Sequence, residues 1–202
     1  MNQIHALLVT APEQIRATYR ILGGVKLVAA VSRSRPTPGH GPEQTLRGSL
    51  KRLAVRHQQH TSDIDGIDTR LGELAAQVNP ALFQLPGVGP LVASQLLVAC
   101  GDNPPERLSS EQQFAALCGT APIPASSGKH QRHRLSRGGD RTANSAIHRI
   151  VLVRMSAGDT RTVDYIARRT AVGKSEREII RCLKRFVARE VFKIIEESAA
   201  RE

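Results

Sequence analysis

The amino-acid sequence predicts an all-α fold. Apolar side chains recur at helical spacings of three and four residues along most of the 202-residue chain. Alternating runs of β-branched or aromatic residues, which indicate strands, are scarce. A hydrophobic content of 40% is enough for one ordinary core and a separate helical appendage.

The first 44 residues are predicted to hold two short helices and a linker. Residues 1–31 show helical spacing with a break near Thr10 and Pro12, where a threonine cap followed by Ala-Pro is typical of a helix start. Residues 32–44, SRSRPTPGHGPEQ, carry proline or glycine at nearly every second or third position. We expect this segment to be a linker.

Residues 45–78 are predicted to form one long helix with a coiled-coil seam. The seam advances in alternating steps of four and three through Leu46, Leu50, Leu53, His57, His60, Ile64, Ile67, Leu71, Leu74 and Val78. Such a register favours pairing with another helix, so we expect a homo-oligomer held by this segment. The two seam histidines are interpreted as register-setting residues rather than metal ligands.

Residues 79–202 are predicted to form a compact helical domain. The domain is predicted to begin with a short helix, the turn LPGVGP at residues 85–90 and a further helix that ends at Gly101. A helix that stops at Gly119 follows. A loop rich in serine and arginine comes next. The last helix, from Ser175, directs isoleucine, leucine and valine inward and leaves its cations largely outside. These cations are Arg181, Lys184, Arg185, Arg189 and Lys193.

The net charge of +11 favours a polyanionic partner, and nucleic acid is the leading one. An anionic membrane is the weaker alternative, because tryptophan is absent and no apolar run approaches the ~20 residues of a span. Cys100, Cys118 and Cys182 are interpreted as buried thiols in a reducing compartment. We therefore expect a soluble cytoplasmic protein that does not bind membranes.

The turn LPGVGP is the first candidate binding element. Gly87 and Gly89 flank Val88, and glycines of this kind allow a backbone to approach a ligand closely at a helix N-terminus. Helix-hairpin-helix modules grip a phosphate backbone in this way without reading bases. The alternative is a tight corner between helices that binds nothing.

The second candidate is the stretch ASSGKHQRHRLSRGGDR, which begins at Ala125. From Ser126 to Arg154 the only acid is Asp140, and the cations are Lys129, Arg132, Arg134, Arg137, Arg141, Arg149 and Arg154. Such density binds a phosphodiester backbone, and arginines can neutralise the charge that develops when a serine attacks phosphorus. On the residues alone, Ser126 and Ser127 are more simply interpreted as turn residues around Gly128.

The segment from residue 79 to 195 resembles the C-terminal half of a family of bacterial insertion-sequence transposases, the DEDD-plus-serine recombinases guided by a bridging RNA. The motifs that carry the resemblance lie at Gly119 to Pro122, Ser127 to Lys129 and Arg137 to Asn144. The preceding helices and heptads are similar to the coiled-coil region of that family. The resemblance implies a role in DNA transposition.

The resemblance also implies roles for single residues. Ser127, with Ser126 as the alternative, would attack a DNA phosphate and hold the cleaved strand as a phosphoserine ester. DNA or guide RNA would be contacted by Gly87, Val88, Gly89, Lys129, Arg132, Arg134, Arg137 and Arg141. The heptad helix would build a multimeric synapse.

Full-length members of that family carry a RuvC-like α/β domain ahead of the coiled coil, in which four acidic residues bind Mg²⁺. This chain is expected to lack that domain, so no cofactor is expected in it. Asp63, Asp65 and Asp68 are interpreted as solvated helix charges. Strand cleavage is then expected only when another chain supplies the metal-binding half. The alternative function is a non-catalytic, dimerising nucleic-acid-binding regulator.

Overall fold

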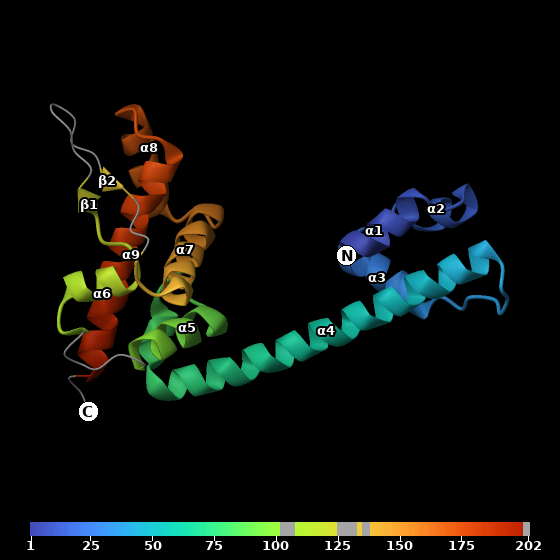
Figure 1. Cartoon of the computed structure of the whole chain (residues 1–202), viewed down its shortest axis with the longest axis horizontal. Coiled ribbons are helices and arrows are strands. Elements are labelled where there is room, and N and C mark those ends of the chain that lie inside the picture. Colours follow the sequence, from blue (N-terminus) through green and yellow to red (C-terminus); the bar gives the residue numbers. More distant parts are fainter. Residues whose placement is uncertain (102–107, 125–132, 135–137, 200–202) are drawn as a thin grey trace. The chain divides into compact units, whose positions relative to one another are not determined.

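The structure is a computed structural model that describes residues 1–101, 108–124, 133–134 and 138–199. The predicted all-α fold class is confirmed, because helices account for almost all regular structure in these ranges. The strands described there are a single pair of two residues each (Figure 1). No helix in the described ranges is both long and apolar enough to cross a membrane.

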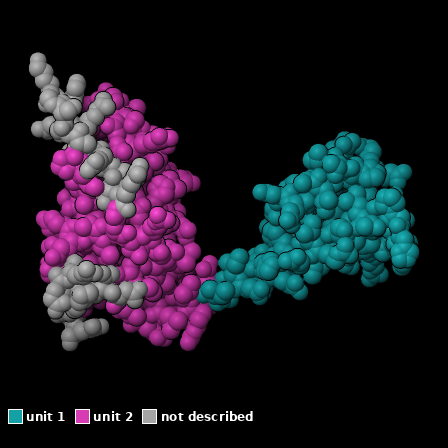
Figure 2. Space-filling model, viewed as in Figure 1, with its two compact units in different colours: residues 1–67 teal, residues 68–202 magenta. Residues whose placement is uncertain are grey.

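The chain divides into two compact units, Met1–Ile67 and Asp68–Glu202 (Figure 2). The division falls within α4, which runs without interruption from Pro42 to Val78. Each unit has its own cluster of buried apolar side chains.

Unit 1 consists of α1 (Asn2–Val9), α2 (Glu13–Tyr19), α3 (Gly24–Arg33) and the first part of α4. Two helices were predicted before residue 32, and the structure has three. The additional break lies at the adjacent glycines 23 and 24, where Gly24 adopts a φ of +53° that other residues rarely tolerate. The core of unit 1 includes Ile4, Ile15, Leu27, Val31, Leu50 and Ala54.

The irregular connection between α3 and α4 is shorter than the predicted linker, because α3 continues to Arg33 and α4 already begins at Pro42. Proline suits the first turn of a helix, since its missing N–H has no partner there in any case. Ser34 ends α3, and its hydroxyl donates a hydrogen bond of 2.6 Å to the carbonyl oxygen of Val31.

The predicted seam of α4 is used in two ways. Leu50 is buried in the core of unit 1, and Leu46 and Leu53 pack against that core. Ile64 and Ile67, in contrast, are 57% and 59% exposed. The first turns of the seam therefore pack on their own chain, and only its later positions are free to meet another helix.

Unit 2 begins within α4 and continues with the 3-10 helix η1 (Pro80–Gln84), α5 (Pro90–Gly101), α6 (Glu111–Leu117), β1 (Ile123–Pro124), β2 (His133–Arg134), α7 (Arg141–Ser156), α8 (Thr160–Ala171) and α9 (Glu176–Ala199). Helix α7 packs against both α5 and α9, and α9 also contacts α6 and α8 (Figure 1). Leu96, Phe114, Ile147, Ile150 and Val191 are among the fully buried residues of this core.

Candidate nucleic-acid interface

The glycine-rich turn at residues 85–90 packs closely on α7. Gly87 has a φ of +85°, and a Cβ placed on it would lie 3.1 Å from the carbonyl oxygen of Ile150. Val88 is half-buried against the core of unit 2. Gly89 has open space around it, where a Cβ would meet no atom within 4 Å. Packing therefore explains the residue type at Gly87, and Gly89 is the glycine at which an external group has room to approach.

Arg154 of α7 fastens this turn to α9. Its Nε donates a hydrogen bond of 2.8 Å to the carbonyl oxygen of Pro86, and its Nη1 lies 2.7 Å from Oε2 of Glu190. The residue is only 8% exposed. The sequence placed Arg154 in the cationic run of the serine segment, but the structure shows that its charge is used inside the domain.

The serine segment begins and ends on a short antiparallel strand pair. Ile123 pairs with Arg134, and Pro124 pairs with His133. Residues 125–132 connect the two strands and lie outside the described residues. That connection contains the sequence-predicted Ser126, Ser127, Lys129 and Arg132. Arg137 is also outside the description, as is the side chain of Arg134.

Two glycines hold the base of this segment together. Gly139 has a φ of +89°, and a Cβ on it would lie 2.5 Å from the carbonyl oxygen of Ala116 and 2.9 Å from the amide nitrogen of Gly119. A Cβ on Gly119, whose φ is +60°, would lie 2.9 Å from Nδ2 of Asn144. No larger residue fits either position without a shift of backbone or side chain. The backbone at Gly119, before the serine segment, is therefore in close contact with the backbone at Gly139, after it.

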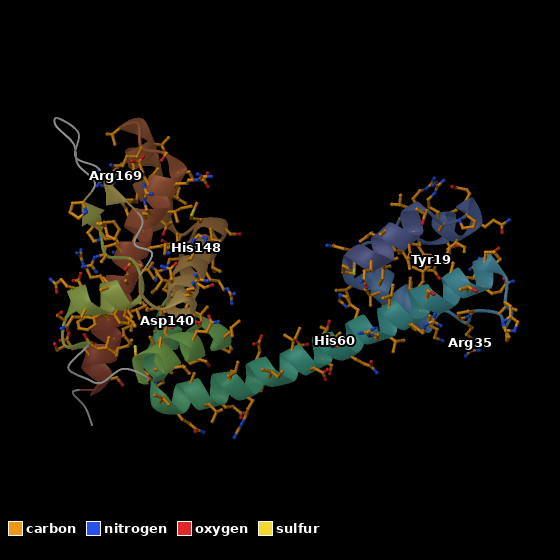
Figure 3. The ribbon with its side chains drawn as sticks, viewed as in Figure 1. Tyr19, Arg35, His60, Asp140, His148 and Arg169 are labelled. Atoms are coloured by element: carbon orange, nitrogen blue, oxygen red, sulfur yellow. The ribbon has the colours of Figure 1, made fainter. Side chains whose placement is uncertain are left out.

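Asp140 joins this base to the start of α7 (Figure 3). Its amide donates a hydrogen bond of 2.7 Å to the carbonyl oxygen of Leu117 at the end of α6. Its Oδ1 accepts one of 2.6 Å from the amide of Ala143 and so caps α7. The Gly-Gly-Asp part of the motif therefore has a defined structural role.

A buried polar chain lies beneath the base. Lys184 of α9 donates from Nζ to Oδ1 of Asn144 at 2.7 Å, and Nδ2 of Asn144 donates to the carbonyl oxygen of Cys118 at 2.6 Å. Lys184 was predicted to lie outside, but it is only 8% exposed. Burial lowers the pKa of its ammonium group. Burial also lowers the pKa of His148, one turn further along α7, and the Lys184 charge lowers it further.

The outer face of α7 is cationic. Arg141, Ser145 and Arg149 follow one another at intervals of four residues, and all three are exposed. Four-residue intervals place side chains on one face of a helix, so the two arginines are about 12 Å apart along its axis. Among the sequence-predicted cations, Arg141 is therefore on an open surface beside the base of the serine segment.

A groove of about 910 Å³ is lined by residues of α7, α8 and α9. Its cations are Arg154, Arg161, Arg168, Arg189 and Lys193, and its acids are Asp159, Asp164, Glu190 and Glu197. The rings of Tyr165 and Phe186 pack edge to face in the wall of the groove, with their centroids 5.2 Å apart. Because the charges nearly balance, this groove is a weaker phosphate surface than the outer face of α7. Sequence reasoning missed it, since three separate helices create it.

The described residues do not fit the Mg²⁺ site that the family resemblance implies. No group of three or more His, Cys, Asp or Glu side chains gathers there in a way that could hold a metal ion. Asp63, Asp65 and Asp68 all lie on α4, where Asp65 and Asp68 share one face and Asp63 lies on the opposite side, so the three carboxylates do not converge on one point.

The segment that contains the glycine turn, the base of the serine segment and α7 also matches a known family. Residues 79–167 match the model of the transposase IS116/IS110/IS902 family. This match supports a transposase family, and with it a role in DNA transposition or recombination. No curated protein matches the chain.

Proposed function

We propose that this chain binds DNA as part of a transposase and presents a serine to a phosphodiester. The observation that supports the proposal most is the base of the serine segment, where Gly119 and Gly139 pack against each other at the start of α7. This packing fixes the described residues on either side of the segment. The exposed Arg141 lies at the same end of α7.

The proposed step is a transesterification. The Oγ atom of Ser127, with Ser126 as the alternative, forms a bond to phosphorus while the bond from phosphorus to one deoxyribose oxygen breaks. The serine loses its proton to a base, and the departing oxygen takes up a proton. The product is a phosphoserine ester. The hydroxyl group of another strand can attack its phosphorus, which forms a new phosphodiester and releases the serine. Arginines near the phosphate neutralise the charge that develops on its oxygens.

The catalytic part of the proposal is tested by trapping the ester. The chain is mixed with a full-length relative whose own serine is mutated, with guide RNA and target DNA, and covalent protein-DNA adducts are separated on denaturing gels. We expect adducts with wild type and none with Ser127→Ala, or none with Ser126→Ala if the neighbour reacts. Ser62→Ala, an exposed serine on α4 outside both the seam and the candidate interface, is the matched control and should form normal adducts. Equal adduct levels in all variants would refute the assignment.

The second candidate function is a dimerising nucleic-acid-binding regulator without chemistry. The exposed Ile64 and Ile67 on the α4 seam favour it, because apolar side chains at heptad positions gain stability from a second helix. This candidate predicts that the chain binds DNA with strong salt dependence, is at least dimeric, and forms no adduct in any complementation mixture. Replacing both isoleucines with glutamate should then reduce the oligomer to a monomer in analytical ultracentrifugation.

A further inference from the structure

Unit 1 contains a small pocket where the ends of α2 and α3 meet α4. It has a volume of about 110 Å³ and is lined by Tyr19, Ser34, Arg35, Pro36, Arg47 and Leu50. These residues come from three helix-related segments that the sequence separates by up to 31 positions. The pocket lies outside residues 79–167, which match the transposase family.

The polar groups of this pocket are predominantly donors. Tyr19 is 9% exposed as a residue, and its hydroxyl oxygen is not among the buried polar atoms that lack a partner, so it is accessible to solvent or to a ligand. The hydroxyl of Ser34 already donates its proton to Val31.

Arg47 is held in place by Glu43. Its Nε and Nη2 donate to Oε1 of that carboxylate at 3.1 and 2.8 Å. Glu43 does not line the pocket. The pair therefore orients the guanidinium and leaves Nη1 of Arg47 available, because an arginine has five N–H donors in a planar fork. Arg35 has no ionic partner among the described residues.

The surroundings of the pocket are strongly cationic. Residues 1–56 contain nine Lys or Arg, namely Arg16, Arg20, Lys26, Arg33, Arg35, Arg47, Lys51, Arg52 and Arg56, against Glu13 and Glu43. This excess of seven positive charges raises the local concentration of anions. Residues 57–67 add Asp63 and Asp65, so unit 1 as a whole carries an excess of five positive charges, against six in residues 68–202.

The size of the pocket limits what it can take. A phosphate group is small enough to enter a pocket of about 110 Å³. Two guanidinium groups and a phenol hydroxyl are suitable donors for phosphate oxygens. We propose that the Tyr19–Arg35–Arg47 pocket binds a single phosphate group of a nucleic-acid backbone, and so provides a contact made by residues of unit 1 in addition to the candidate interface of unit 2.

The test uses the full chain and a fluorescently labelled random-sequence DNA duplex, with anisotropy measured at several KCl concentrations. Arg35→Ala should lower the affinity by about threefold to tenfold, and the slope of log K against log salt should fall by about one. Tyr19→Phe keeps the charge and the packing, and should lower the affinity by about threefold. The matched control is Arg33→Ala, which removes the same charge from an exposed arginine that does not line the pocket. It should change the affinity by less than about twofold.

Two outcomes would overturn the proposal. Equal losses for Arg33→Ala and Arg35→Ala, together with no effect of Tyr19→Phe, would show only general attraction to a basic surface. The second arm titrates inorganic phosphate against ¹⁵N-labelled protein. The pocket would be assigned to free phosphate, and not to a nucleic acid, by two results together. The first is a saturable change in the amide chemical shift of Arg35 that disappears in Tyr19→Phe, and the second is unchanged DNA affinity in Arg35→Ala and Tyr19→Phe. Loss of DNA binding by Arg149→Glu reports on the unit 2 interface separately, so failure of one site is distinguishable from failure of the other.

Discussion

Lys184 and Asn144 are joined by a buried hydrogen bond of 2.7 Å between α9 and α7. The same asparagine donates to Cys118, the residue that precedes Gly119 at the base of the serine segment. The ammonium group is therefore linked through one side chain to the backbone that positions this segment. Its protonation state should affect both the stability of unit 2 and the order of that base.

The first prediction concerns pH. Burial lowers the pKa of Lys184 below its ordinary 10.5, so the unfolded chain holds this proton more tightly than the folded one. Between the lowered pKa and 10.5, unfolding takes up a proton, and the contribution of Lys184 to stability therefore rises with pH. We expect the free energy of unfolding of wild type minus that of Lys184→Met to increase as the pH approaches 10.5. Urea denaturation at several pH values measures it, and a constant difference would contradict the prediction.

The second prediction concerns the glycine base. Gly139→Ala should lower the free energy of unfolding by about 3 kcal/mol, because a left-handed backbone costs about 1–2 kcal/mol and the added methyl group overlaps backbone atoms. Gly158→Ala is the matched control. Its φ is +70°, but the Cβ would meet no atom within 4 Å, so only the backbone term of about 1 kcal/mol remains. Chemical denaturation of both variants measures the difference, and equal values would show that Gly139 is not crowded.

The third prediction concerns the clamp on the glycine-rich turn. Arg154→Met removes the hydrogen-bond partner of the Glu190 carboxylate and of the Pro86 carbonyl group. The variant should therefore have a free energy of unfolding that is lower by about 2 kcal/mol or more. Arg161 approaches the same carboxylate at 3.8 Å but is 89% exposed. Arg161→Ala should therefore change stability by less than about 0.5 kcal/mol. A double-mutant cycle of Arg154→Met with Glu190→Gln should give less than the sum of the single effects, and strict additivity would argue against a direct interaction.

The fourth prediction concerns the outer face of α7. Arg149→Glu should lower DNA affinity by about tenfold near 0.1 M salt, because it both removes a phosphate contact and adds a repelling charge. Arg177→Glu makes the same change of two charge units at an exposed position in the first turn of α9. It should have a clearly smaller effect in the same anisotropy titration. If the two variants lose equal affinity, the attraction is general and α7 is not the interface.

The fifth prediction concerns the cysteines. Cys118 is fully buried and Cys100 is half-buried. Burial raises the pKa of these thiols to about 12 and about 11. At pH 8 about one thiol in a thousand or fewer is then the reactive thiolate. Both residues should stay unmodified when the native protein is treated with iodoacetamide and analysed by mass spectrometry, and both should react in urea. Rapid native labelling of Cys118 would contradict the burial seen here.

Several helix positions follow from the sequence, but α8 was not predicted, and the candidate site follows only in part. The final helix was predicted to start near Ser175 and to direct its apolar residues inward, and the structure has α9 at Glu176–Ala199 with Ile179, Val187 and Val191 buried. The break at residues 23 and 24 was missed, because two adjacent glycines weaken a helix without a clear change of apolar spacing. The roles of Ser126 and Ser127 stay predictions.

By itself the sequence determined that this protein is helical and strongly basic. Helical spacing is a local property of neighbouring residues, and net charge is a sum over them, so neither requires knowledge of the fold. Only the tertiary structure decided that Lys184 and Arg154 are interior cations and that Gly119 meets Gly139 across 20 positions. Burial and close approach depend on which helix covers which face. That arrangement is determined by contacts between residues far apart in the chain, so it cannot be read from neighbouring residues alone.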